Sequence, residues 1–278
     1  MKLLTFEHAG RASWGALAGD AVADLGAATG HAGIVELLRA GALEEAEAAI
    51  GGAPGIALSE IAFLPVLGPP AKLVCIGLNY MVHVREMNRA VPTVPSVFLK
   101  YHDALAGHER DIVRPRVSGA FDFEGELAVV IGRAGRYIEE ANAFGHVAGY
   151  TILNDGSIRD WQEENLSAGK NFPGTSGFGP CFVTADEIPD PHALAVCTRL
   201  NGETVQDGNT ADFIFGIPRL VNYVSGFTPL APGDVISTGT PHGVGHGRTP
   251  PLYMKPGDTI EVEIERIGTL ANRVVQES

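Results

Sequence analysis

The chain has 278 residues, of which 45% are hydrophobic and 19% charged, so its composition is globular and it can bury a large core. Its formal net charge of −13 argues against a nucleic-acid backbone or an anionic membrane surface as partner. The 35 glycines and 18 prolines predict many turns and short elements, which favours a strand-dominated α+β fold over a helical bundle.

The cellular compartment is suggested by the cysteines and by the N-terminal residues. Cys75, Cys181 and Cys197 are odd in number and widely spaced, which is typical of free thiols in a reducing compartment. The first residues show no charged region followed by an apolar core, so we expect no secretory signal. Because no apolar stretch is long enough to span a bilayer, we expect a cytoplasmic protein with no membrane partner.

Residues 1–68 differ in composition from the rest of the chain. They are rich in alanine and glycine, and the spacing of their apolar residues predicts one helix over residues 34–49. Pro69 and Pro70 then form a plausible junction. We therefore expect a small N-terminal α+β domain over residues 1–68 and a larger domain over residues 69–278.

The larger domain opens with two predicted strands, over residues 72–76 and 96–100, with a helical segment between them. In a helix, His83 and Glu86 are spaced i, i+3 and share one face. A carboxylate that holds one imidazole nitrogen leaves the other nitrogen free to accept a proton. This pair therefore predicts a general base, although an exposed His–Glu pair without a chemical role is the alternative.

Three acidic residues lie at the ends of two apolar runs. Glu124 and Glu126 alternate with glycine just before the apolar run of a predicted strand over residues 128–132, and Asp155 follows a second apolar run over residues 149–154. Convergent carboxylates favour a hard divalent ion, either Mg²⁺ or its substitutes Mn²⁺ and Ca²⁺. The alternative is a solvated strand face that carries acids on its water side.

The C-terminal half adds three predicted elements and one polar loop. Asn201-Gly202 predicts a hairpin turn, residues 213–226 a helix with Pro218 in its first turn, and residues 259–264 a half-exposed strand. The loop over residues 233–245 is rich in glycine, so its backbone N–H groups and the Thr240 hydroxyl could hold a carboxylate.

Together, these segments resemble the fumarylacetoacetate hydrolase family over roughly residues 70–275. The similarity rests on short motifs in a fixed order: Ile76 to Tyr80 with His83 and Glu86, Phe123-Glu124-Gly125-Glu126-Leu127, Gly149-Tyr150 with Asn154-Asp155, Arg159-Asp160 with Gln162, Lys170 before Gly179-Pro180, Asn201-Gly202-Glu203, and Pro232-Gly233-Asp234 before Thr238-Gly239-Thr240-Pro241.

The resemblance implies a mixed β-sandwich roll, usually dimeric, with Mg²⁺ or a similar ion held by Glu124, Glu126 and Asp155. The residue patterns and the resemblance together assign the remaining roles. The expected catalytic residues are His83, Glu86, Lys170 and Gln162. The expected substrate-binding residues are Tyr80, Arg159, Gly239 and Thr240.

The reaction that the resemblance implies is hydrolysis of a carbon–carbon bond in an acylpyruvate or a related 2,4-dioxo acid. In that scheme His83 activates a water molecule, while Lys170 and Gln162 stabilise the oxyanion. One alternative is decarboxylation or isomerisation of an oxaloacetate-type acid on the same scaffold, and a second is a noncatalytic metal- or ligand-binding protein. Candidates for a second substrate carboxylate remain unranked: Tyr80, Arg85, Arg89, Arg159 and His242.

Overall fold

The computed structural model describes residues 1–69 and 72–278, so half of the predicted Pro69–Pro70 junction lies outside the described residues. Its strands are β1 Lys2–His8, β2 Arg11–Ala18, β3 Ala21–Asp24, β4 Gly55–Ala57, β5 Ala62–Phe63, β6 Leu73–Gly77, β7 Ser96–Leu99, β8 Leu105–Ala106, β9 Asp111–Arg114, β10 Phe121–Asp122, β11 Gly125–Ile131, β12 Val147–Asn154, β13 Ser157–Ile158, β14 Ser176–Thr184, β15 Ala195–Leu200, β16 Glu203–Asn209, β17 Val235–Ser237, β18 Thr259–Ile264 and β19 Gly268–Gln276. Its α-helices are α1 Gly26–Thr29, α2 Ile34–Ala40, α3 Leu43–Ala49, α4 Met81–Glu86, α5 Arg159–Glu164, α6 Leu166–Gly169 and α7 Ile217–Phe227.

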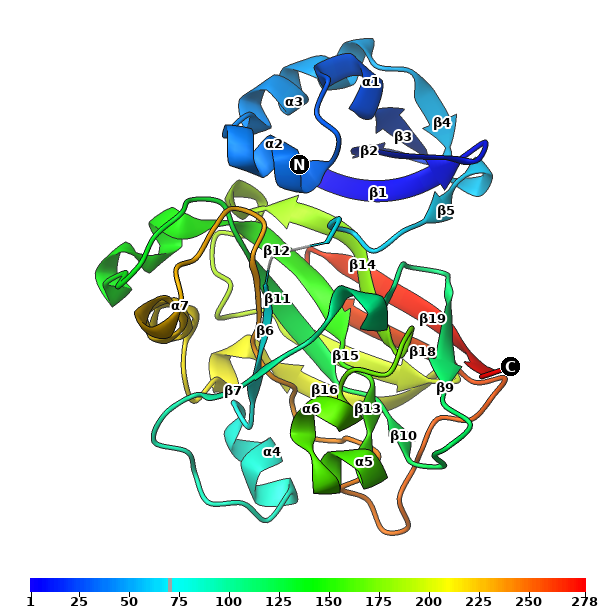
Figure 1. The fold of residues 1–278 in the computed structure, drawn as a ribbon, viewed down its shortest axis with the longest axis vertical. Coiled ribbons are helices and arrows are strands. Elements are labelled where there is room, and N and C mark those ends of the chain that lie inside the picture. The colour runs from blue at the N-terminus through cyan, green and yellow to red at the C-terminus, as the bar shows by residue number, and fades with distance from the viewer. Residues whose placement is uncertain (70–71) are drawn as a thin grey trace.

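Two large sheets dominate the molecule (Figure 1). The first has twelve strands with the main order β4-β3-β2-β1-β14-β12-β11-β17-β6-β7, and the second has the order β16-β15-β18-β19-β9. Most neighbours are antiparallel, but β17 pairs with β6 in parallel and β19 pairs with β9 in parallel. The predicted strand-dominated α+β fold with mixed sheets is therefore confirmed.

A hydrophobic core fills the space between the two sheets. Ile152 of β12 belongs to the same buried cluster as Val196 of β15 and Val262 of β18. The strand predicted over residues 259–264 has those same bounds in the structure, and its alternate residues Ile260, Val262 and Ile264 are buried. The alternation of apolar and polar residues along this strand therefore predicted correctly which side chains face the core.

The single helix predicted over residues 34–49 is wrong. The structure has two short helices there, α2 and α3, which are separated at Gly41. Gly41 has a φ of 66°, and its N–H group donates to the carbonyls of Leu37 and Leu38, which ends α2. Glycine adopts this left-handed conformation without a steric penalty, so a helix boundary forms where the apolar spacing alone suggested continuity.

Two other local predictions are confirmed. The turn between β15 and β16 places Asn201 at a φ of 53° and Gly202 at a φ of 82°. Helix α7 begins at Ile217, four residues later than predicted, and Pro218 lies in its first turn. Proline is compatible with that position because the first-turn N–H groups have no intrahelical acceptor.

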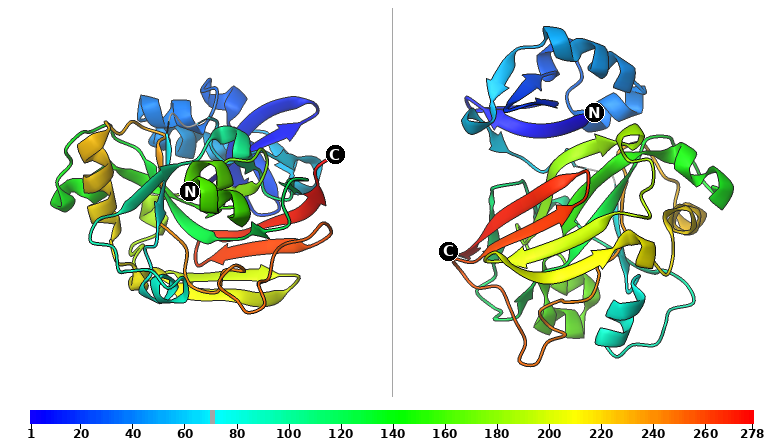
Figure 2. Two further views of the ribbon diagram at one scale, coloured as in Figure 1. Left: turned by 60° about the horizontal axis from the view of Figure 1, so that its bottom comes forward. Right: turned by 180° about the vertical axis from the view of Figure 1, so that it is seen from behind.

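The N-terminal elements form a cap at one end of the molecule, as Figures 1 and 2 show. Their strands continue the large sheet through β1, which pairs with β14 by the partners Lys2↔Val183 and Leu3↔Phe182. One buried cluster also contains residues from both parts, including Trp14 and Phe178. The division into domains 1–68 and 69–278 stays a prediction.

Helices α4, α5 and α6 lie at the opposite end of the molecule from this cap (Figures 1 and 2). They lie at the end of the large sheet where β11, β17, β6 and β7 follow one another. Within the described residues, every helix is too short or too polar to traverse a lipid bilayer.

Candidate active site

The three predicted metal ligands lie together because β11 and β12 are paired. The register places Gly125 opposite Asn154, and the Asp155 N–H group donates to the Glu124 carbonyl at 2.8 Å. Glu124, Glu126 and Asp155 are all buried, and one carboxylate oxygen from each lies within 4.8 Å of the others. The alternative of a solvated strand face is therefore wrong.

Lys170 forms ion pairs with two of these three carboxylates. Its Nζ donates to Glu124 Oε2 at 2.6 Å and to Asp155 Oδ2 at 2.8 Å. Burial alone would raise the pKa of Glu124, but the charges of Lys170 and Arg159 outweigh it and lower this pKa to about 2. Burial would likewise lower the pKa of Lys170, but Asp155 and Glu124 raise it above its usual value. Glu124 and Lys170 therefore face each other as a charged pair.

Glu126 differs from the other two ligands because no lysine or arginine contacts it among the described residues. It accepts hydrogen bonds from the Ser237 hydroxyl and from the Gly239 N–H group. Burial, followed by the charges of Asp155 and Glu124, raises the pKa of Glu126 well above its usual value. A buried carboxylate in this state is stabilised in its ionised form when a cation binds beside it.

A divalent ion therefore fits this set of residues. Together with the neighbouring Asp122, the trio makes four buried carboxylates. They face three buried cations, which are Lys100, Lys170 and Arg159. The donor atoms are all carboxylate oxygens, which suit Mg²⁺, Mn²⁺ or Ca²⁺ better than a soft ion. Glu124, Glu126 and Asp155 would hold such an ion.

Lys100 belongs to the site although the sequence analysis did not identify it. Its side chain is fully buried, and Nζ lies 2.8 Å from Asp155 Oδ1. It also donates to Ser176 Oγ at 2.9 Å and to the carbonyl oxygen of Lys170. The only signal in the sequence is a lysine placed directly after the apolar strand β7, where a charge is buried only if it has partners.

Arg159 connects the carboxylates to helix α5. Its guanidinium donates to Asp122 Oδ2 at 2.8 Å, to Glu124 Oε1 at 2.6 Å and to Gln162 Oε1 at 2.8 Å. Asp122, which the sequence analysis also missed, accepts further hydrogen bonds from the N–H groups of Gly245 and His246. Because the Gln162 oxygen is already occupied, its amide nitrogen is the group left to donate to a substrate.

The predicted general base is present on α4. His83 Nδ1 lies 2.9 Å from Glu86 Oε2, and the other oxygen of Glu86 accepts from the Gly243 N–H group at 2.8 Å. Burial would raise the pKa of Glu86, but the hydrogen bonds from His83 and Gly243 lower it overall. An ionised Glu86 fixes the His83 ring and keeps the proton on Nδ1, so Nε2 is available as a base.

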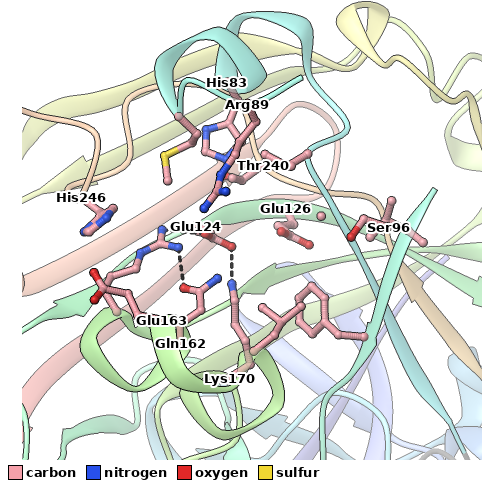
Figure 3. A pocket seen from close by; sticks show the side chains of 17 residues that line it. His83, Arg89, Ser96, Glu124, Glu126, Gln162, Glu163, Lys170, Thr240 and His246 are labelled. Carbon is pink, nitrogen blue, oxygen red and sulfur yellow. Dashed lines mark hydrogen bonds and ion pairs between the residues drawn. The ribbon is translucent and has the colours of Figure 1, made fainter. Parts of the chain in front are cut away.

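These groups line a cavity of about 370 Å³ that is bounded by α4, α5, α6 and the strand ends (Figure 3). In this view His83 comes from the α4 side, while Gln162 and Lys170 approach from the opposite side. The predicted residues that line the cavity are His83, Arg89, Glu124, Glu126, Arg159, Gln162, Lys170 and Thr240. Glu86 and Asp155 lie directly behind this lining and contact it through His83 and Lys170.

Two predicted substrate-binding residues lie outside the lining. Tyr80 is 2% exposed and packs edge-on against Phe213 with ring centroids 5.0 Å apart. Gly239 has a φ of 95° and supports Glu126 through its N–H group. Thr240 reaches the cavity, but its hydroxyl already donates to the Gly125 carbonyl at 3.1 Å. Gly239 and Thr240 thus support β11 and its Glu126 carboxylate, whereas Tyr80 packs in the core.

Comparison with known proteins independently supports the family resemblance of the sequence. A sequence profile for the C-terminal region of fumarylacetoacetate hydrolase matches residues 72–275. The mitochondrial oxaloacetate tautomerases FAHD2A of Bos taurus and of Homo sapiens are each 44% identical to the chain over 226 residues, which is 80% of this chain and 72% of theirs.

Two solved structures share the whole fold. A fumarylacetoacetate hydrolase from the psychrophile Exiguobacterium antarcticum is 36% identical, with a TM-score of 0.89 and complete coverage of both chains. The maleylpyruvate hydrolase of Sphingobium sp. SYK-6, in complex with manganese(II) and pyruvate, is 30% identical, with a TM-score of 0.85 and complete coverage of both chains. Profile, sequence and fold agree, and the chain belongs to the fumarylacetoacetate hydrolase family.

Proposed function

We propose that this enzyme interconverts the keto and enol forms of a 2-oxo acid of the oxaloacetate type. The observation that carries the proposal is the buried base His83, which faces a cavity lined by two of the three clustered carboxylates. Enolisation needs a base near the carbon next to the oxo group and stabilisation of the charge that develops on oxygen. The two 44% identical relatives carry the same activity in their names.

The residues divide this chemistry between them. His83 Nε2 removes a proton from C3 of the substrate, and Glu86 stabilises the imidazolium that results. Protonated Lys170 and the amide of Gln162 are the donors that can stabilise negative charge on the substrate oxygens. The His83 imidazolium then delivers this proton to the oxygen on C2, so the reaction moves one proton and conserves all atoms. A divalent ion held by the three carboxylates would polarise the 2-oxo group and acidify the C3–H bond.

Hydrolysis of an acylpyruvate is the second candidate, and it is the reaction that the sequence analysis expected. It is favoured by the likeness to a maleylpyruvate hydrolase, which shares the complete fold. In this reaction His83 would deprotonate a water molecule instead of substrate carbon, and the water would attack the distal carbonyl carbon C4. The C3–C4 bond would then break, which releases a carboxylic acid and the enolate of pyruvate. Decarboxylation of an oxaloacetate-type acid, the other alternative, would need no attacking water. The alternative of a noncatalytic binding protein has no support among these relatives.

The two reactions can be separated by their products. Enol absorbance of freshly dissolved oxaloacetate is followed with Mn²⁺-loaded protein, and pyruvate is quantified in parallel. A tautomerase accelerates the change in absorbance without releasing pyruvate. Pyruvate release from an acylpyruvate would instead establish the hydrolase, and pyruvate from oxaloacetate would establish a decarboxylase. An enzyme that leaves every one of these acids unchanged would contradict the proposal.

Two variants test the assigned roles. His83→Ala should slow turnover by a factor on the order of a hundred or more, because the base is lost, while Mn²⁺ affinity stays unchanged. Glu126→Gln should abolish metal-dependent turnover and weaken Mn²⁺ binding. Glu261→Gln on the half-exposed strand β18 is the matched control. If His83→Ala weakened Mn²⁺ binding as much as it slowed turnover, a structural role would be indicated for His83.

The remaining assignments are part of the same proposal. We propose Mg²⁺ as the ion in the cell, because its preference for oxygen ligands matches the three carboxylates. A homodimer is consistent with the large apolar side chains that are exposed around the cavity, including Leu99, Trp161 and Leu166. A cytoplasmic location is consistent with three free cysteines, although the named relatives are mitochondrial.

A further inference from the structure

The cavity has two chemically different ends. At its inner end lie the buried carboxylates with Lys170 and Arg159, which are already paired. Its outer end is lined by Arg89, Glu163 and His246, of which Arg89 and Glu163 are exposed. In Figure 3, Arg89 extends from the α4 side toward the side that carries Gln162. A substrate bound through its 2-oxo acid group at the inner end would therefore present its other end to Arg89.

Arg89 is the cavity arginine whose charge is available to a ligand. Arg159 is held by Asp122 and Glu124, and binding a substrate carboxylate would mean giving up those buried ion pairs. For Arg89, no carboxylate lies within ion-pairing distance in the part of the chain that the structure describes. A guanidinium with free donors at the mouth of a cavity binds carboxylates with two parallel hydrogen bonds.

The backbone holds Arg89 in place although it follows the end of α4. Asn88 has a φ of 49°, and its N–H group donates to the Arg85 carbonyl at 3.0 Å. The Arg89 N–H group donates to the Val84 carbonyl, also at 3.0 Å. This pair of bonds is a Schellman motif, in which asparagine is the commonest substitute for glycine at the left-handed position. The cap therefore fixes the residue that follows α4 relative to His83.

His246 offers a second donor at the same end. Its backbone N–H group is held by Asp122 Oδ2 at 3.0 Å, and its ring Nδ1 lies 2.8 Å from the Tyr253 hydroxyl. When the phenol donates to Nδ1, the proton of the neutral ring is on Nε2, which can then donate to a ligand. Glu163 acts in the opposite sense, because its carboxylate repels an anion at the same mouth.

We propose that Arg89, assisted by His246, binds the distal carboxylate of the substrate and so selects 2-oxo dicarboxylates over 2-oxo monocarboxylates. The inference rests on the proposed function for the position of the 2-oxo acid group, and it assigns the opposite end of the same substrate. Arg89 is thereby a specificity-determining residue, and it takes no part in the proton transfer.

The test compares two acids that differ only at the distal end. Binding of 2-oxoglutarate and of 2-oxopentanoate to Mn²⁺-loaded protein is measured by calorimetry, without any need for turnover. Arg89→Gln should weaken 2-oxoglutarate binding about tenfold or more, because a charged hydrogen-bonded pair is lost, and leave 2-oxopentanoate binding unchanged. Arg89→Lys should restore part of the loss by keeping the charge. Arg85→Gln is the matched control, since Arg85 is exposed on α4 outside the cavity lining.

Two further measurements test the opposite effects of the Glu163 and Arg89 charges. Glu163→Gln should tighten 2-oxoglutarate binding, and added salt should weaken binding of this acid more in the wild type than in Arg89→Gln. Equal weakening of both acids by Arg89→Gln, or no weakening of either, would overturn the proposal. If the protein discriminates between the two acids through Arg89 but does not turn over oxaloacetate, the distal site stands and only the proposed reaction fails.

Discussion

At the scale of single residues, Lys100 illustrates how the fold tolerates its buried acids. Its ammonium group is fully buried between Asp155, Ser176 and the carbonyl of Lys170. A buried charge is stable only while its partners remain, so removing one member of this group leaves Asp155 with an unbalanced charge. The lysine therefore substitutes for part of the positive charge that an ion would bring.

We predict that Lys100→Met destabilises the metal-free protein by about 3–5 kcal/mol, the usual cost of breaking a buried ion pair on one side. Addition of Mn²⁺ should raise the melting temperature of the variant by more than that of the wild type, because the ion takes over as counter-charge for Asp155. Thermal unfolding with and without Mn²⁺ measures both effects. Lys255→Met, at an exposed lysine, is the control. An equal Mn²⁺ shift in Lys100→Met and wild type would contradict the assigned role.

Which site residues the sequence could predict depends on whether their pattern is local. Glu124 and Glu126 form a two-residue pattern, and His83 and Glu86 share one helical turn, so the chain itself shows their proximity. Lys100 and Asp122 meet their partners through contacts across 55 and 37 positions of sequence. No short pattern records such contacts, which is why both residues were found only in the structure.

At the scale of elements, the glycine-rich segment over residues 243–247 contacts helix α4 at Glu86. The Gly243 N–H group donates to Glu86, and the Gly247 Cα lies so close that an added Cβ would be 2.7 Å from Glu86 Cγ. The loop therefore supports the carboxylate that in turn orients His83. The loop predicted to hold a carboxylate spans residues 233–245. In the structure its N–H groups at Gly239 and Gly243 donate to the carboxylates of Glu126 and Glu86.

We expect Gly247→Ala to lower the catalytic rate and leave Mn²⁺ affinity unchanged, because the new methyl group displaces Glu86 from His83 and does not reach the carboxylate trio. Steady-state kinetics and Mn²⁺ calorimetry on one preparation test this directly. Gly226→Ala in α7 is the control, since a Cβ there meets no atom within 4 Å. That control should stabilise the protein by about 0.5–1 kcal/mol. Unchanged kinetics in Gly247→Ala would show that the loop does not position Glu86.

The predicted elements succeeded where a single local signal dominated. Alternation identified β18, and Asn201-Gly202 identified the turn before β16, because both signals arise from neighbouring residues. The helix over residues 34–49 failed because apolar spacing was weighed above Gly41, whose left-handed conformation ended α2. The parallel pairing of β17 with β6 joins distant segments, and no local pattern in the sequence records it.

At the scale of the whole molecule, buried histidines make stability depend on pH, and His108 and His192 are two of them. Burial lowers the pKa of His108 and of His192, although Glu109 and Asp190 partly offset the effect. Both rings accept a backbone hydrogen bond, from Ala271 N–H at 3.0 Å and from Ile217 N–H at 3.0 Å, respectively. A protonated ring nitrogen cannot accept, so the folded state disfavours the charged form.

The sign of the effect follows from these lowered pKa values. Below the unfolded pKa of about 6.5, the unfolded chain binds more protons than the folded one, so the free energy of unfolding falls as the pH falls. The raised pKa of Glu126 acts in the opposite sense, and it is common to the wild type and the histidine variants. We therefore predict that lowering the pH from 7.5 to 5 is less destabilising, by melting temperature, for His192→Gln than for the wild type. His8→Gln, at a partly exposed histidine at the end of β1, should keep the wild-type pH difference. An equal pH difference in all three proteins would contradict this account.

Residues 1–68 share the large sheet with the rest of the chain, and this sharing decides whether they unfold separately. The pairing of β1 with β14 and the common cluster that contains Trp14 and Phe178 favour one cooperative transition. Calorimetry of the full chain should therefore show a single heat-absorption peak. Two resolved peaks would support the predicted N-terminal domain as an independent folding unit.

The arrangement of Lys100, Lys170 and Arg159 around the acidic trio has a practical consequence for handling the enzyme. Because the polypeptide brings most of its own counter-charge, a chelator should strip the ion and leave an intact, empty scaffold that can be reloaded. The same protein preparation can then be filled in turn with Mg²⁺, Mn²⁺ or Ca²⁺, and their effects compared on one unchanged fold.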